Sequence, residues 1–538
     1  MNNKLWKNGF ARLVRLLCLL CSLNGVSSQF SPALAQQVAS QDAHFDVLEF
    51  RVNGVTKLSA LQVEQAVTPY LGLNKTIEDV QNASEALEKT YHDAGYLTVL
   101  VSIPPQKVED GIVRLLATEA SVSRLRVVGS HYYSLGQIRD AAPELAEGQV
   151  PNFAVVQDEL GALNHSPDRH VTPVLRPGKE SGTVEVDLNV EDQLPFHGEA
   201  DINNRYSQFG SPNHASATLH WDNLWGQQHS IGLTLQTVVA NPQESSVASV
   251  NYTWPLQGAD TLALYMVRSN SNVTYSGLTN VLGTGNIYGA RYVDVLPGYN
   301  GFSHSATFGV DYKSFGQSVS LVNAGGFNTP IDYLPWIAEW DGTWTGVQSV
   351  SRLGASFNFH MSHLVGSDQQ FADKRYRGLA NYFYIKGSAS RNATDDSGWG
   401  FNLRSTWQLA TQALISNEQF SIGGADTVRG YLESSAMGDL GLAASVELTT
   451  PNLMGYATAN SLSDLRLLAF IDAGTVEVLY PLTDGDQYNI SSTGVGLRLK
   501  GARGLSLELD FATALTDLST VGVHSGDAMV HFKLAYEW

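Results

Sequence analysis

Apolar and polar residues alternate over long stretches of the chain between Phe196 and Trp538. In the last stretch, the apolar positions are Val530, Phe532, Leu534, Tyr536 and Trp538. The same period of two recurs around residues 231–235, 442–449, 495–500 and 505–511. Because successive side chains of a β-strand point to opposite faces, this period predicts strands with one apolar and one polar face.

The predicted strands are long and regularly spaced. We expect sixteen, beginning near residues 196, 214, 228, 247, 260, 286, 302, 331, 349, 374, 399, 441, 464, 490, 503 and 528. Many approach the length of about ten residues that a tilted strand needs to cross a bilayer. A soluble sandwich also has one apolar face, but tryptophans gather at predicted strand ends, as membrane girdles require. Residues 195–538 are therefore predicted to form a sixteen-stranded antiparallel transmembrane β-barrel.

The chain before Pro195 repeats one order of elements twice. In residues 45–119, a strand at 45–53 precedes helices that begin near Ser59 and Thr76, both typical N-cap residues. Strands at 97–103 and 111–118 complete this unit. Residues 120–194 are expected to hold a strand at 122–128, helices at 134–142 and 152–163, and strands at 170–175 and 183–190. The sequence predicts two small α+β domains of order β-α-α-β-β.

The N-terminus has the pattern of a secretory signal peptide. Basic residues precede an apolar stretch at 13–23, and Ala33-Leu34-Ala35 offers small residues for cleavage. We expect a signal at 1–35 and a short tail at 36–44. Both cysteines leave with the signal, so the mature chain forms no disulfide. Removing four basic residues lowers the formal charge from −19 to −23, which disfavours nucleic-acid binding.

Asp472 lies on an unexpected face of its predicted strand. By alternation, Phe470, Asp472 and Gly474 face away from Leu467 and Ile471, and therefore toward the inside of a closed barrel. The longest predicted connection, residues 412–440, carries Arg429 between the glycine pair at 423–424 and Gly430. Glycine permits tight turns with positive φ, so this loop is expected to bend inward and pair Arg429 with Asp472. The alternatives are a solvated loop arginine and a wet carboxylate beside Lys500 or Arg498.

These motifs match a known family of transporters. The two predicted α+β domains resemble POTRA modules in element order, in length and in the segments Ala162-Leu163-Asn164, Pro167-Asp168-Arg169 and Leu175-Arg176-Pro177-Gly178. Val428-Arg429-Gly430-Tyr431 and Phe470-x-Asp472-x-Gly474 resemble the paired signatures of POTRA-bearing outer-membrane transporters. With two POTRA units (45–119 and 120–194) and sixteen strands, the chain is similar to the two-partner secretion transporters called TpsB.

The resemblance implies a role in protein export. A TpsB transporter lies in the outer membrane of a Gram-negative-type cell and secretes a large hemolysin- or adhesin-type exoprotein. Its POTRA domains capture the unfolded partner in the periplasm, and its barrel acts as the pore. The resemblance further implies that Arg429, Gly430 and Tyr431 on the loop meet Phe470, Asp472 and Gly474 in the lumen. We expect a monomer in contact with lipid, with no cofactor, metal, nucleotide or nucleic acid bound.

Three other functions compete with secretion. An assembly factor that inserts barrel proteins belongs to the same superfamily but usually carries more POTRA units. A diffusion porin needs neither the periplasmic domains nor the arginine loop. An enzyme is disfavoured because neither a Gly-x-Ser-x-Gly elbow nor a His-Glu-x-x-His motif occurs. Some transporters of the family also plug the barrel with an N-terminal helix. Residues 36–44 are too few for one, because crossing 30 Å takes about 20 residues.

Overall fold

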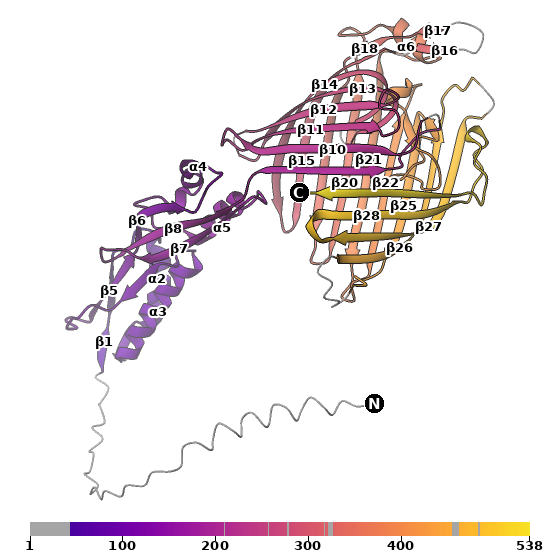
Figure 1. The fold of residues 1–538 in the computed structure, drawn as a ribbon. Helices are drawn as coiled ribbons and strands as arrows, with labels where there is room; N and C mark the ends of the chain where they lie inside the picture. Colours follow the sequence, from indigo (N-terminus) through magenta and orange to yellow (C-terminus); the bar gives the residue numbers. More distant parts are fainter. Residues whose placement is uncertain are drawn as a thin grey trace, which may run out of the picture. The chain divides into compact units, whose positions relative to one another are not determined.

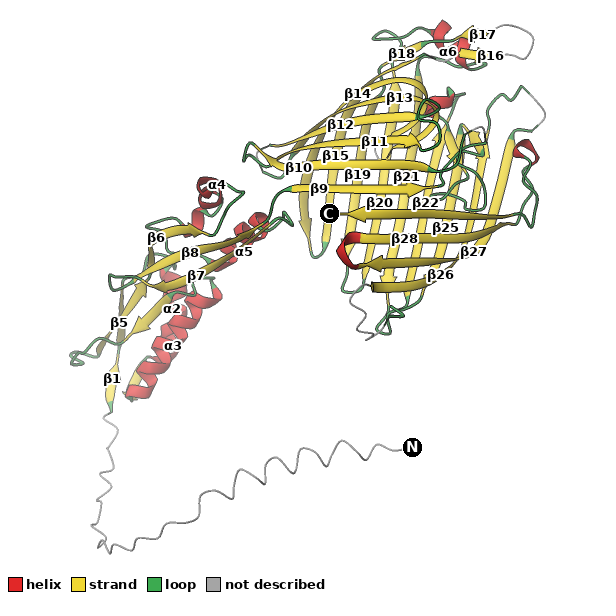
Figure 2. Cartoon of the chain, viewed as in Figure 1, coloured by secondary structure: helices red, strands yellow, loops and turns green. Residues whose placement is uncertain are grey.

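The computed structural model describes residues 44–538 except 209, 257, 277–278, 317, 321–325, 455–461 and 483–484. The predicted signal peptide and almost all of the predicted tail lie outside the described residues. Figures 1 and 2 show the helices and strands of the chain. The chain divides into two compact units. Of the described residues, one unit comprises those in 44–124, 144–157 and 176–185, and the other comprises those in 125–143, 158–175 and 186–538. No helix in the described ranges combines the length and apolar character needed to span a membrane.

The first α+β region has the predicted helices and strands, with one additional strand, β3, between the two helices. Its elements are β1 (Phe45–Val47), β2 (Glu49–Asn53), α2 (Ala60–Val67), β3 (Gly72–Lys75), α3 (Ile77–Asp93), β4 (Val99–Ser102) and β5 (Ile112–Glu119). Ser59 and Thr76 are the N-caps of α2 and α3, and they form complete capping boxes with Gln62 and Asp79. Helix α3 buries Val80, Leu87 and Tyr91 on one face, against a three-stranded sheet of order β2-β5-β4.

A second detail of this region also differs from the prediction. The strand expected at 45–53 is two strands, because β1 pairs with β3 and β2 pairs in parallel with β5. Leu48 separates them, and its backbone N–H donates to the carbonyl of Gly111. Two consecutive short strands that belong to different sheets show the same alternation as one long strand. The pattern of apolar residues therefore does not distinguish the two cases.

The next region repeats the arrangement. It consists of β6 (Ser121–Val128), α4 (Leu135–Asp140), α5 (Phe153–Leu163), β7 (Arg169–Pro177) and β8 (Thr183–Asp192). Its sheet has the order β6-β8-β7, which is equivalent to the order β2-β5-β4 of the first region. Every element begins within a few residues of its predicted position.

The remainder of the chain forms a closed antiparallel barrel (Figure 1). Its strands are β9 (Phe196–Asn203), β10 (His214–Leu224), β11 (His229–Val238), β12 (Ser246–Pro255), β13 (Thr261–Ser276), β14 (Thr279–Tyr299), β15 (Phe302–Phe315), β18 (Ile331–Tyr333), β19 (Trp336–Thr345), β20 (Ser349–His360), β21 (Tyr382–Thr394), β22 (Gly400–Ala410), β25 (Leu440–Thr449), β26 (Leu462–Glu477), β27 (Gln487–Gly501), β28 (Leu505–Ala514) and β29 (Ala528–Glu537). Strands β18 and β19 both pair with β15 and share one place in the sheet. The barrel therefore has the sixteen strands that the sequence predicts, and β29 closes it against β9.

Two predicted strand starts are wrong. Strand β14 begins at Thr279 and not near residue 286, and the strand expected from residue 374 begins later. Residue 374 ends the helix α6 (Asp368–Lys374), and the strand begins only at Tyr382. Ser367 caps this helix, and the side chain of Gln370 completes its capping box. Serine followed three residues later by glutamine marks a helix start, and this signal outweighs the alternation expected there.

Alternation decides which side chains face the lumen. On β26, Leu467 is 45% exposed and Ile471 is 62% exposed, whereas Phe470 is 2% and Asp472 0% exposed. The exposed apolar positions lie on the outer wall, where lipid solvates them. The polar positions face inward, so the predicted orientation of Asp472 agrees with the structure.

Candidate functional site

The long loop after β22 folds against the inner wall of the barrel. It spans residues 411–439 and contains the short hairpin of β23 (Phe420–Ile422) and β24 (Ala436–Gly438). Val428 and Tyr431 are fully buried in a cluster with wall residues of β25 to β28. Those wall residues are Ala443, Val476, Ile490 and Ala514. Apolar packing therefore holds the loop in the lumen, in addition to any charge pairing.

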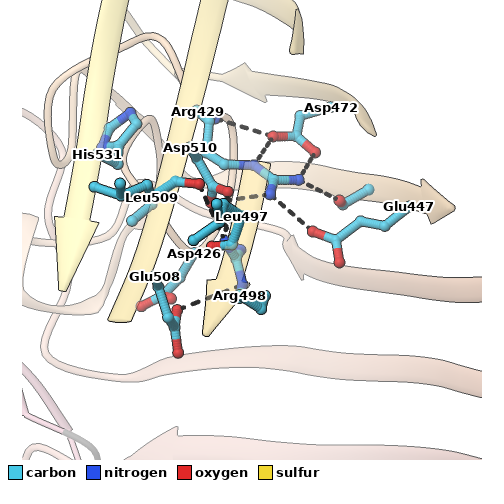
Figure 3. Close-up of polar contacts among 12 residues, drawn as sticks. Asp426, Arg429, Glu447, Asp472, Leu497, Arg498, Glu508, Leu509, Asp510 and His531 are labelled. Carbon is cyan, nitrogen blue, oxygen red and sulfur yellow. Dashed lines mark hydrogen bonds and ion pairs between the residues drawn. The ribbon is translucent and has the colours of Figure 1, made fainter. Parts of the chain in front are cut away.

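Arg429 and Asp472 form a bidentate ion pair inside the barrel (Figure 3). The Arg429 Nε donates to one carboxylate oxygen at 2.8 Å, and its Nη2 donates to the other at 2.9 Å. The backbone N–H of Arg429 also donates to Asp472, at 3.1 Å. Arg429 is 1% exposed and Asp472 0%. Three hydrogen bonds to one carboxylate fix both the side chain and the backbone of the loop tip.

Other groups complete the surroundings of the Arg429 guanidinium. Its Nη1 lies 2.8 Å from Glu447 and 3.3 Å from Asp510. The Phe470 ring lies beneath it, with 3.4 Å between the guanidinium carbon and the ring centre, which adds a cation–π contact. Arg498, one of the cations considered as a partner for Asp472, instead holds Asp510 with two hydrogen bonds. Glu508 also lies 3.8 Å from Arg498, so two arginines and four carboxylates form one network (Figure 3).

The remaining motif residues shape the loop around this pair. Gly430 has φ +88°, and its N–H donates to Nε2 of His531 at 3.0 Å. The Tyr431 hydroxyl donates to the carbonyl of Thr516 at 2.7 Å. A Cβ on Gly474 would lie 3.0 Å from Cγ2 of Val428. The structure thus brings all six predicted site residues together, while their role in secretion stays a prediction.

Replacing Gly474 by valine is expected to push the loop off the wall. The new side chain would occupy the space of Val428, and overpacking of this kind costs about 1–3 kcal/mol. We expect faster hydrogen exchange across residues 411–439 in purified protein. Gly316→Val is the matched control, because a Cβ at Gly316 would meet open space. Gly496 is unsuitable, because a Cβ there would meet Asp510. Unchanged exchange in Gly474→Val would contradict this packing role.

A second anchor of the loop is absent from the sequence prediction. Glu418, which is 2% exposed, accepts hydrogen bonds from Lys313 Nζ at 2.7 Å and from the hydroxyls of Tyr333 and Tyr384 at 2.6 Å each. In the sequence, the one sign that Glu418 is buried is its position close to the apolar run 413–415. Its partners lie 34 to 105 residues away in the chain, so only the closed barrel brings them together.

A third contact lies at the loop tip. Arg205, just beyond the end of β9, donates to both oxygens of Asp426 at 2.6 and 3.0 Å. The loop therefore binds the wall through charged groups at its base and at its tip. Together with the apolar cluster, these contacts hold the loop against the wall at several points.

Comparison with known proteins identifies the class. Residues 45–120 match the model described as "POTRA domain, ShlB-type", and residues 337–499 match "Haemolysin secretion/activation protein ShlB/FhaC/HecB". The chain is a sixteen-stranded outer-membrane barrel of the transporter type with a periplasmic POTRA domain. The second α+β region lies outside the POTRA match, so its assignment as a further POTRA domain stays a prediction.

Two individual proteins with similar sequences are transporters by name. The chain is 21% identical to the heme/hemopexin transporter protein HuxB of Haemophilus influenzae over 83% of this chain and 79% of that protein. It is 24% identical to the outer membrane transporter CdiB of Dickeya dadantii, over 35% of this chain and only 33% of that protein. These matches confirm the resemblance to two-partner secretion transporters that the motifs indicated.

Solved structures support the fold. CdiB from Escherichia coli superposes with a TM-score of 0.64 at 16% identity, covering 94% of this chain and 93% of that chain. BamA from Haemophilus ducreyi lacking POTRA domains 1–3 gives a TM-score of 0.57 at 14% identity, covering 92% of this chain and 100% of that chain. At these identities, both likenesses concern the fold alone.

Proposed function

We propose that this protein is an outer-membrane translocator that passes one large partner protein from the periplasm to the cell surface. The observation that carries the proposal is the combination of a ShlB-type POTRA domain with a barrel whose lumen holds a docked loop. A loop that restricts the pore and can move aside suits the passage of an extended partner chain. The pore then opens only while the partner crosses. The partner is a hemolysin- or adhesin-type exoprotein, and a heme-binding exoprotein is a further candidate because HuxB is named for heme/hemopexin transport.

The first α+β region offers an edge for the partner. Strand β4 is an edge strand of its sheet, and exposed edges accept extended chains as added strands. Two side chains of α3 bind the backbone of Val101 on β4. The Val101 N–H donates to the Glu88 carboxylate at 2.9 Å, and the Val101 carbonyl accepts from the Ser84 hydroxyl at 3.0 Å. A partner strand that replaces these two side-chain hydrogen bonds gains backbone pairing without leaving buried groups unpaired.

Deleting the gene and comparing the surface and secreted proteins tests the proposal. We expect one large exoprotein to disappear and to return on complementation, while other outer-membrane barrels keep their abundance. A general fall in those barrels would instead indicate an assembly factor. A large, steady conductance of the purified protein in planar bilayers, without loss of any exoprotein, would indicate a diffusion porin.

A further inference from the structure

Two histidines and two aspartates gather away from the docked loop. His197 lies at the start of β9, His220 and Asp222 lie near the end of β10, and Asp168 directly precedes β7. All four belong to the same compact unit of the chain. The contacts described so far for the loop and the edge strand use none of them, so the cluster requires its own explanation.

The geometry of the cluster is convergent. His197 and His220 are direct cross-strand neighbours, and their rings are stacked with 4.9 Å between centres. His197 Nε2 lies 2.8 Å from the Asp168 carboxylate, and His220 Nδ1 lies 2.9 Å from Asp222. The possible ligand atoms of Asp168, His197 and Asp222 all lie within 4.8 Å of one another.

The charges in the cluster lack a permanent counter-ion. The Asp168 side chain is 0% exposed, and desolvating a carboxylate is costly without a cation. Within the described residues, the ion pairs of Asp168 and Asp222 are to histidine alone. The neighbouring Arg169 turns away, since its guanidinium donates twice to the carbonyl of Leu163 and covers the Tyr133 ring. Two carboxylates therefore converge on imidazoles with no lysine or arginine between them.

Asp168 is also held in place from a second side. The Gln193 side-chain amide donates to its Oδ1 at 3.0 Å, and the Gln193 N–H donates to the Asp168 carbonyl at 2.9 Å. Hydrogen bonds of this kind orient carboxylate ligands in metal sites. The second oxygen of Asp168 faces His197, so the orientation needed for binding exists before any ion enters.

We propose that Asp168, His197 and Asp222 bind a divalent transition-metal ion of the zinc type, with His220 as the fourth ligand. Mixed imidazole and carboxylate donors suit zinc, nickel and copper, whereas calcium and magnesium take oxygen ligands. Zinc binds such atoms at about 2.0–2.2 Å in a tetrahedron, so the ligands draw closer when the ion enters. The bound ion ties the segment before β7 to the first two strands of the barrel and restricts their relative motion.

Zinc titration of the purified, untagged, full-length protein tests this site. After chelator treatment in detergent, isothermal titration calorimetry is expected to detect one saturable Zn²⁺ site. His197→Ala and Asp222→Asn are each expected to weaken binding by about tenfold or more, since even outer-shell changes cost that much. His524→Ala is the matched control, because His524 is an exposed histidine lying 4.0 Å from Asp517, and it should bind Zn²⁺ like the unmodified protein.

Folding and ligand identity are checked separately. Heat-dependent migration on gels reports whether each variant keeps its barrel, and Asp222→Asn preserves side-chain shape should His197→Ala fail to fold. Zinc X-ray absorption is expected to show two imidazoles among four nitrogen and oxygen neighbours. The proposal is overturned if no saturable site is found, or if folded His197→Ala or Asp222→Asn protein binds Zn²⁺ as tightly as the unmodified protein.

Discussion

Replacing Arg429 by glutamate is expected to abolish secretion of the partner protein while the barrel still assembles. The change removes the cation from a site where Asp472, Glu447 and Asp510 converge, and it adds a fourth carboxylate. Breaking a buried ion pair costs about 3–5 kcal/mol, which is enough to undock the loop tip. Barrel assembly is spared because no β-ladder hydrogen bond involves Arg429. Exoprotein in the medium and heat-modifiable barrel in the membrane are the two measurements.

Arg377→Glu is the matched control for this experiment. Arg377 is also a loop arginine with a cation–π contact, 4.4 Å from the Tyr480 ring, but it is exposed and lies outside the docked loop. It should secrete normally. Normal secretion by a correctly assembled Arg429→Glu protein would remove the proposed role of the Arg429–Asp472 pair.

Replacing Glu418 by glutamine is expected to release the base of the loop and open the pore. Glutamine keeps the shape, but its one amide oxygen replaces only one of the two carboxylate oxygens that accept from Tyr333 and Tyr384. Lys313 then lies largely buried, 13% exposed, without a carboxylate. An unpaired buried charge costs about 3–5 kcal/mol. We expect larger and steadier conductance in planar bilayers and faster hydrogen exchange across residues 411–439.

The double variant Glu418→Gln with Lys313→Met isolates the charge pair. Removing both charges is often nearly neutral, so the double variant should regain much of the low conductance. Glu244→Gln controls for a general loss of acidic charge, because Glu244 binds Ser211 rather than the loop. A double variant as open as Glu418→Gln would show that Glu418 acts by some means other than neutralising Lys313.

The two variants separate two possible roles of the anchors. If both Arg429→Glu and Glu418→Gln open the channel but only Arg429→Glu stops secretion, the loop tip takes part in translocation and the base only restricts leakage. If both changes stop secretion, the whole docked loop acts as a brace for the pore. In the proposed function, the partner first adds a strand at β4, where backbone hydrogen bonds replace those from Glu88 and Ser84 to Val101. This capture comes before the partner reaches the loop in the barrel.

Local patterns predicted most of the elements because their causes are local. The capping boxes at Ser59 and Thr76 need only neighbours within three residues. The inward face of Asp472 follows from the period of two along one strand. Alternation is also a local pattern, so it does not reveal that β1 and β2 join different sheets. The strand expected from residue 374 was wrong although the deciding signal, the capping box at Ser367, is itself local.

The sequence by itself determined the barrel, its number of strands and most of the elements in both α+β regions, and it predicted the pairing of Arg429 with Asp472. These follow from period, spacing and motif, which are properties of short segments. Only the tertiary structure decided the anchor of Glu418 to Lys313, the pairing of Arg498 with Asp510, and the cluster around Asp168. Those contacts depend on which strands become neighbours when the sheet closes, and closure is set by the summed packing and hydrogen bonding of all its strands together.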